Sequence, residues 1–105
     1  MNNREPQINL QTLAVLAKCL ADENRLRILL CVGTGKKSVS RIVEDLGLSQ
    51  PLVSHHLKEL KRSLLVQVER SGPFVYYEMA DARILGILKN LDALARDLLS
   101  KRTTF

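Results

Sequence analysis

Several polar side chains between positions 50 and 58 have the chemistry that reads DNA. Glutamine pairs bidentately with adenine, serine and histidine hydrogen-bond to base edges, and lysine binds guanine or phosphate. Helical spacing places four such residues on one face: Gln50, Ser54, His55 and Lys58. The opposite face is apolar and carries Val53, Leu57, Leu60 and Leu64. We interpret this stretch as an amphipathic helix. Its polar face is either a DNA-reading surface or an ordinary solvated one.

The same stretch contains residue types that serve in nucleophilic catalysis. Ser54, His55 and His56 supply a hydroxyl and two imidazoles. Adjacent helical residues point about 100° apart, so spacing alone does not make Ser54 and His55 an oriented pair. The sequence also has no glycine-rich phosphate loop, no G-x-S-x-G elbow and no acidic metal cluster. We predict that the protein is not an enzyme and that His56 is partly buried beside the polar face.

A second short helix precedes this one across a three-residue corner. Its apolar residues repeat at helical spacing: Val39, Ile42, Val43 and Leu46. Gly47 suits the left-handed position just past a helix end. Ser49 is a good N-cap for the next helix, and Pro51 is tolerated in its first turn. The pattern predicts a helix-turn-helix, a motif whose second helix commonly enters the DNA major groove.

A hairpin is predicted directly after the second helix. Residues 66–69 and 75–79 alternate between apolar and polar, and Arg70-Ser71-Gly72-Pro73 supplies turn chemistry between them. Such a wing places its tip near phosphate or the minor groove, and Arg70 is the best-placed cation for that contact. The predicted DNA-binding residues are therefore Ser49, Gln50, Ser54, His55, Lys58 and Arg70.

The remaining chain predicts one mainly α domain with a small β-hairpin wing, in which four helices precede the hairpin and one follows it. We expect a flexible arm over residues 1–8, the domain over 9–101 and a tail over 102–105. Asn9 and Asp22 are the expected caps of the first two helices, and Asp81 is the expected cap of the last one. In the second helix, 23–32, Leu26, Leu29 and Leu30 are expected to face inward, and Arg25 and Arg27 outward.

Composition limits the function classes. The chain has 16 Lys and Arg against 11 Asp and Glu, a formal net charge of +5. This balance is compatible with nucleic acid without demonstrating it. There is no apolar run of about 18 residues, and the N-terminal MNNREPQINL has no secretory apolar core. We expect a cytoplasmic protein without a membrane partner.

The last helix is more apolar than one small core can cover. Its apolar residues follow helical spacing: Ile84, Ile87, Leu88, Leu91, Leu94, Ala95 and Leu98. Leu85 and Leu99 widen this surface further. An unpartnered apolar face of that size indicates a contact with another chain rather than simple packing on its own domain.

Three blocks together resemble the ArsR/SmtB family of small bacterial and archaeal repressors. They are LADENRLRILL, DLGLSQPLVSHHLKELK and GPFVYYEMAD, at residues 20–30, 45–61 and 72–81. The resemblance covers residues 13–99. It implies a homodimer that binds an inverted-repeat operator and is released by an effector. It also implies that the first and last helices form the dimer interface, for which we predict Leu13, Leu16, Ile87, Leu91, Leu94 and Leu98.

The chain departs from that family at both familiar metal sites. Ser38 and Ser40 stand where metalloid-sensing members carry two cysteines, and a hydroxyl is a poor ligand for soft ions. The last helix has Asp92 and Asp97 but none of the histidines that zinc-sensing members use there. We therefore expect no metal or other cofactor at these positions.

The sequence leaves open whether the two cysteines are reactive. Cys19 and Cys31 are twelve residues apart, and we favour two small core residues over a thiol sensor, because apolar helices with few cations slow the reaction of a thiol.

Two function classes are compatible with the sequence. The favoured function is a DNA-binding repressor whose partners are double-stranded DNA and a second copy of itself. The alternative is a winged interaction module that binds protein without operator-specific DNA binding. The operator and the effector are not evident from the sequence.

Overall fold

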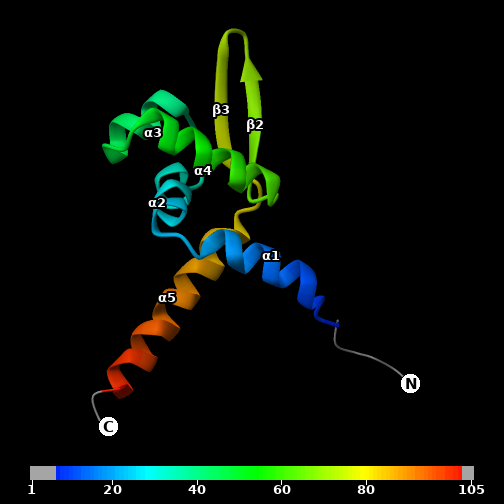
Figure 1. Ribbon diagram of the computed structural model, residues 1–105, viewed down its shortest axis with the longest axis vertical. Helices are drawn as coiled ribbons and strands as arrows, with labels where there is room; N and C mark the ends of the chain where they lie inside the picture. The colour runs from blue at the N-terminus through cyan, green and yellow to red at the C-terminus, as the bar shows by residue number, and fades with distance from the viewer. Residues whose placement is uncertain (1–6, 103–105) are drawn as a thin grey trace.

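The computed structural model describes residues 7–102 and has five helices and a three-stranded sheet within that range (Figure 1). The elements in chain order are α1 (Leu10–Leu20), α2 (Glu23–Val32), β1 (Lys36–Ser38), α3 (Val39–Leu46), α4 (Gln50–Arg62), β2 (Val66–Ser71), β3 (Phe74–Met79) and α5 (Arg83–Lys101). The predicted mainly α fold with a hairpin wing is confirmed. The predicted arm and tail fall largely on residues 1–6 and 103–105, outside the described residues.

Side-chain caps begin the first four helices at the predicted places. The side chains of Asn9 and Asp22 each accept a hydrogen bond from the backbone amide three residues later, at 3.0 and 3.1 Å. Ser38 and Ser49 do the same for α3 and α4, at 3.2 and 3.3 Å. Each cap satisfies one amide that the helix itself leaves without a partner, which is why these short polar residues mark the helix starts.

Asp81 acts slightly differently at the start of α5. The helix is capped by Ala82, which makes no side-chain hydrogen bond. Asp81 Oδ1 instead accepts from the Arg83 amide at 2.8 Å, and its carboxylate also binds the Arg83 guanidinium. These bonds lower the pKa of Asp81 to about 2. Asp81 therefore stabilises the start of α5 as predicted, but it lies one residue before the N-cap position.

The core lies where α2, α3 and α4 meet the base of the hairpin. Six side chains are fully enclosed: Ile28, Leu29, Ile42, Val53, Leu57 and Leu60. Leu65, Val66 and Met79 close this core at the hairpin end. The inward positions Val53, Leu57 and Leu60 were predicted correctly. Ile28 was not among the predicted inward residues of α2, whereas Leu30 was, and Leu30 is 55 % exposed.

The sheet has one strand more than the predicted hairpin. β2 and β3 pair antiparallel from Val66↔Met79 to Ser71↔Phe74, as the alternation predicts. β1 then pairs with the other edge of β3, with Lys37 opposite Tyr77. Because β1 is only three residues long and rich in lysine, it has no alternating pattern of its own. The ladder of β3 supplies its hydrogen bonds.

The end of α4 differs from the prediction. Leu64 was expected to continue the apolar face of the helix, yet it is 80 % exposed and has a left-handed φ of 65°. The amide of Leu64 binds the Lys61 carbonyl and the amide of Leu65 binds the Leu60 carbonyl, at 3.0 and 2.9 Å. This is a Schellman ending in which a leucine occupies the position usually taken by glycine. Leu65 therefore turns into the core in place of Leu64.

The elements divide into a compact part and two projecting helices. α2, α3 and α4 pack together, the hairpin extends on one side, and α1 and α5 diverge on the opposite side (Figure 1). None of the helices within residues 7–102 combines the length and the apolarity that crossing a membrane requires.

Candidate nucleic-acid interface

α4 is held so that one face is buried and the other is free. Val53, Leu57 and Leu60 anchor its inner side in the core. Gly47, at φ 67°, turns the chain between α3 and α4, and no atom lies within 4 Å of where a Cβ would stand. The corner is therefore shaped by backbone conformation rather than by crowding. All four residues of the predicted reading face are exposed: Gln50, Ser54, His55 and Lys58.

The start of α4 favours an anion. Ser49 caps the helix through Leu52, and Pro51 occupies its first turn, where a missing amide leaves no gap in the hydrogen bonding. Helix N-termini carry a partial positive charge and free amides that bind phosphate oxygens. Gln50 and Ser54 lie within the first two turns, so the residues that suit base edges lie next to a helix end that suits a phosphate.

Ion pairs remove much of the positive charge around the helix-turn-helix. Four of its cations are paired: Lys36 with Glu69, Lys37 and Arg41 with Asp45, and Arg62 with Glu59. The Lys37 ammonium, 2.6 Å from Asp45 Oδ2, lowers the pKa of that carboxyl. Within residues 36–70, three cations form no ion pair with any of residues 7–102, namely Lys58, Lys61 and Arg70. The unpaired positive charge of this region thus lies on α4 and on the hairpin.

The hairpin extends beyond the body of the molecule and ends at Gly72 and Pro73 (Figure 1). Gly72 has φ 59°, a conformation that the tight turn requires and that glycine adopts without strain. Arg70 lies in β2 opposite Val75, one pair before the tip, and is exposed. Arg70 was predicted in the turn but lies in β2, where it still provides an exposed cation near the tip.

Phe74 is a tip residue that the sequence analysis missed. It is 58 % exposed at the first position of β3, and its ring lies 6.2 Å from that of Tyr76. The sequence analysis did not assign Phe74 to the strand, because the alternation of apolar and polar residues begins only at Val75. The glycine–proline turn immediately before it was the signal that could have placed it at the tip.

The helices that diverge from the body carry a wide apolar surface. No side chain of α5 is buried, and its outer residues are more than half exposed: Ile87, Leu91, Leu94, Leu98 and Leu99. Leu13 of α1 is exposed to a similar degree, whereas Leu16 packs partly against the core. Five of the six predicted interface residues are thus open in the single chain.

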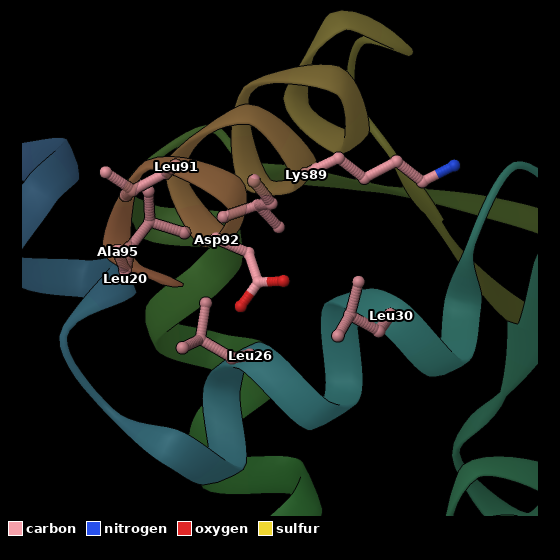
Figure 2. A pocket seen from close by; sticks show the side chains of 8 residues that line it. Leu20, Leu26, Leu30, Lys89, Leu91, Asp92 and Ala95 are labelled. Carbon is pink, nitrogen blue, oxygen red and sulfur yellow. The ribbon is translucent and has the colours of Figure 1, made fainter. Parts of the chain in front are cut away.

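A hollow of about 430 Å³ lies between α2 and α5. Figure 2 shows the Asp92 carboxylate pointing from α5 toward Leu26 and Leu30 of α2. Asp92 is also paired with Arg96 at 2.8 Å. Leu30 therefore faces this hollow rather than the core, which corrects the inward position predicted for it.

The two cysteines have different surroundings. Cys19 is buried, and its Sγ lies 3.7 Å from the Glu59 carbonyl. Cys31 is half-buried, and the Lys37 ammonium lies 3.4 Å from its Sγ. The expectation of few nearby cations is wrong for Cys31, because β1 brings Lys37 back against α2. A sensing role for either thiol stays a prediction.

Comparison with known proteins matches this architecture. Residues 22–68 match the family model described as bacterial regulatory protein, arsR family. The repressor SmtB of Mycobacterium tuberculosis is 39 % identical over 90 residues, 86 % of this chain and 65 % of that protein. The arsenic resistance regulator ArsR1 of Pseudomonas putida is 33 % identical over 97 residues, 84 % of this chain and 76 % of that protein. The chain belongs to the ArsR family. It is a transcriptional regulator with a winged helix-turn-helix, not an enzyme.

A solved ArsR-type structure agrees with the arrangement of the elements. The homodimeric winged helix-turn-helix DNA-binding domain Mb0332 of Mycobacterium bovis has a TM-score of 0.76 at 29 % identity, covering 86 % of this chain and 83 % of that one. The ArsR-family match spans α2 to the middle of β2, so it contains α4 but not α1 or α5. The open faces of those two helices are thus outside the part that the family model describes.

Proposed function

We propose that the protein is a repressor that binds an inverted-repeat operator as a homodimer and is released by an effector. The observation that carries this proposal is α4, whose exposed face presents Gln50, Ser54, His55 and Lys58, beginning at the serine-capped start of the helix. The exposed apolar residues of α1 and α5 support a dimer. The repressor SmtB, the arsenic resistance regulator ArsR1 and the homodimeric Mb0332 are similar chains.

Selection of bound duplexes from a random DNA library tests this function. We expect recovered sequences to contain an inverted repeat with half-sites about one helical turn apart. Binding should weaken steeply with salt, because phosphate contacts release counterions. In a transcription assay, the protein should lower the output of a promoter that carries the recovered operator. No enriched sequence, together with retention of a protein partner, would instead support a winged interaction module.

Arg70→Ala is expected to weaken binding to operator and random duplexes by the same factor. Arg70 lies near the hairpin tip without an ion-pair partner among residues 7–102, so we assign it a phosphate rather than a base. Losing one phosphate contact should lower the slope of log K against log salt by about one. Mobility-shift titrations at several salt concentrations measure this slope.

Arg102→Ala is the matched control for the hairpin variant. It removes one positive charge at the end of α5, on the far side of the molecule from the hairpin (Figure 1). The control should keep the wild-type salt slope. An unchanged slope in Arg70→Ala, or an equal change in both variants, would show that the hairpin tip does not contact DNA.

We propose that zinc, cadmium and arsenite do not bind tightly at either familiar family location. Ser38 Oγ and Ser40 Oγ lie 3.2 Å apart, and Ser38 is engaged as the cap of α3. Hydroxyls are weak ligands for these soft species. Calorimetric titration of each species into reduced protein should show no binding that is removed by Ser38→Ala or Ser40→Ala, or, on the last helix, by Asp92→Asn or Asp97→Asn. Tight binding lost in those variants would contradict the proposal.

A further inference from the structure

One arginine links three helices behind the recognition helix. Arg25 Nε of α2 donates to the carbonyl of Cys19, in the last turn of α1, at 2.6 Å. Arg25 Nη1 lies 3.4 Å from Nδ1 of His56 on α4. A guanidinium only donates, so a hydrogen bond at this contact requires that Nδ1 accepts and that the imidazole is neutral. This position corrects the sequence analysis, which placed Arg25 on the outer face of α2.

Apolar packing of α1 against the core is confined to its last turns, where Cys19 is buried and Leu16 and Leu20 are partly buried. A hollow of about 310 Å³ separates the two helices and is lined by Val15, Lys18, Cys19, Arg25, Glu59, Arg62 and Ser63. Across it, Cys19 Sγ makes a long contact with the Glu59 carbonyl at 3.7 Å. Polar contacts beside this hollow therefore add to the apolar packing in setting the angle between α1 and α4, and the Arg25 bridge contains the shortest of them.

His56 is the buried end of this bridge. Its side chain is 6 % exposed, and charged groups face it from two sides. From α2 and its cap, Arg25 lies 3.4 Å away and Asp22 Oδ1 lies 3.9 Å from Nε2. From α4 itself come Glu59 and the His55 ring, the latter with a centroid distance of 5.2 Å. Burial lowers the pKa of His56, Arg25 and His55 act in the same direction, and Asp22 and Glu59 oppose them.

We propose that Arg25 and His56 are positioning residues for DNA recognition. They hold α4 at a fixed angle to α1, and α1 belongs to the dimer surface, so the bridge sets the distance between the two recognition helices of a dimer. A protonated imidazole has no acceptor for Arg25, so protonation of His56 releases the bridge. Neither residue touches DNA. The inference rests on the proposed operator-binding function.

Arg25→Lys separates positioning from folding. A lysine ammonium keeps the charge but does not reproduce the planar fork that reaches Cys19 and His56 together. We expect the affinity for a selected operator with two half-sites to fall by about tenfold, because the two α4 helices no longer match its spacing. The affinity for a duplex with one half-site should change by less than about twofold. An equal change on both duplexes would show a general loss of folded structure and overturn the inference.

The pH dependence provides a second readout. As pH falls from about 7.5 to about 4.5, the wild-type ratio of operator affinity to half-site affinity should fall, because His56 gains a proton. Since burial lowers the pKa of His56, the fall should come below the ordinary histidine pKa of about 6.5. His56→Asn keeps an acceptor near the place of Nδ1 and does not titrate, so its ratio should stay constant. His55→Asn is expected to have lower affinity for both duplexes and to keep the wild-type fall of the ratio. Because His55→Asn removes the imidazole that the function places on the DNA, a fall of the ratio that persists in this variant does not come from the DNA contact of His55.

The outcomes distinguish this inference from the function on which it rests. If the wild type selects no operator, both are wrong. If the wild type selects an operator but its affinity ratio does not change with pH, or changes equally in His56→Asn, only the positioning role is wrong. Should Arg25→Lys fail to fold by circular dichroism, the ratio measured for His56→Asn decides alone.

Discussion

Leu91→Glu is expected to abolish the dimer and, with it, tight operator binding. Leu91 is more than half exposed in the single chain, at the centre of the apolar face of α5. We expect a dimer through α5 to bury it, and an unpaired carboxylate in an apolar interface costs several kcal/mol. A monomer engages only one half-site, so operator affinity should fall by about 10²- to 10⁴-fold. Leu94→Glu should have the same effect.

Sedimentation and mobility shift measure the two parts of this result on the same samples. Ala93→Glu is the matched control, because it adds the same carboxylate to an exposed position of α5 that helical spacing places away from Leu91. The control should remain a dimer with wild-type affinity. A stable wild-type monomer, or a Leu91→Glu protein that still dimerises, would show that α5 is not the interface.

Ser54→Ala and His55→Ala are each expected to weaken operator binding by about 1–3 kcal/mol and to relax its sequence preference. Both side chains are exposed near the start of α4, while their neighbours Val53 and His56 are buried. Truncating them therefore removes surface chemistry and leaves the core intact. A lost base contact reduces affinity for the correct sequence and leaves phosphate binding unchanged.

Random duplexes provide the comparison for these two variants. Their affinity should stay close to that of the wild type, and the thermal midpoint of each variant should not fall. Renewed selection from the DNA library should show one or two operator positions that no longer prefer a base. An equal loss on operator and random duplexes would mean that Ser54 and His55 contact only the DNA backbone.

Local sequence was sufficient wherever one helical turn decides the structure. Asn9, Asp22, Ser38 and Ser49 each bind an amide three residues onward, so both partners of the interaction lie within a few residues. The helix-turn-helix corner and the register of β2 with β3 were predictable for the same reason. The exposed reading face followed directly, because it lies opposite the buried side of an amphipathic helix.

Periodicity failed where backbone hydrogen bonds ended an element early. Leu64 continues the apolar spacing of α4, but the helix ends before it. The Schellman hydrogen bonds of the Leu64 and Leu65 amides turn the chain there and leave the Leu64 side chain exposed. β1 was invisible for a related reason, since three residues without alternation become a strand only by pairing with β3. Both outcomes depend on neighbours that a pattern along one segment does not contain.

The sequence by itself thus determined the helix-turn-helix, the hairpin and the polar face of α4, since these depend on short-range caps, turns and apolar spacing. Tertiary structure alone decided that Arg25 bridges α1 and α4, that Lys37 lies against Cys31, and that Leu30 faces the hollow beside α5. An arginine or a leucine on a helix has the same local spacing whether it meets water, a neighbouring helix or a hollow. Only the packing angles of the helices select among these environments, and those angles arise from contacts between segments far apart in the chain.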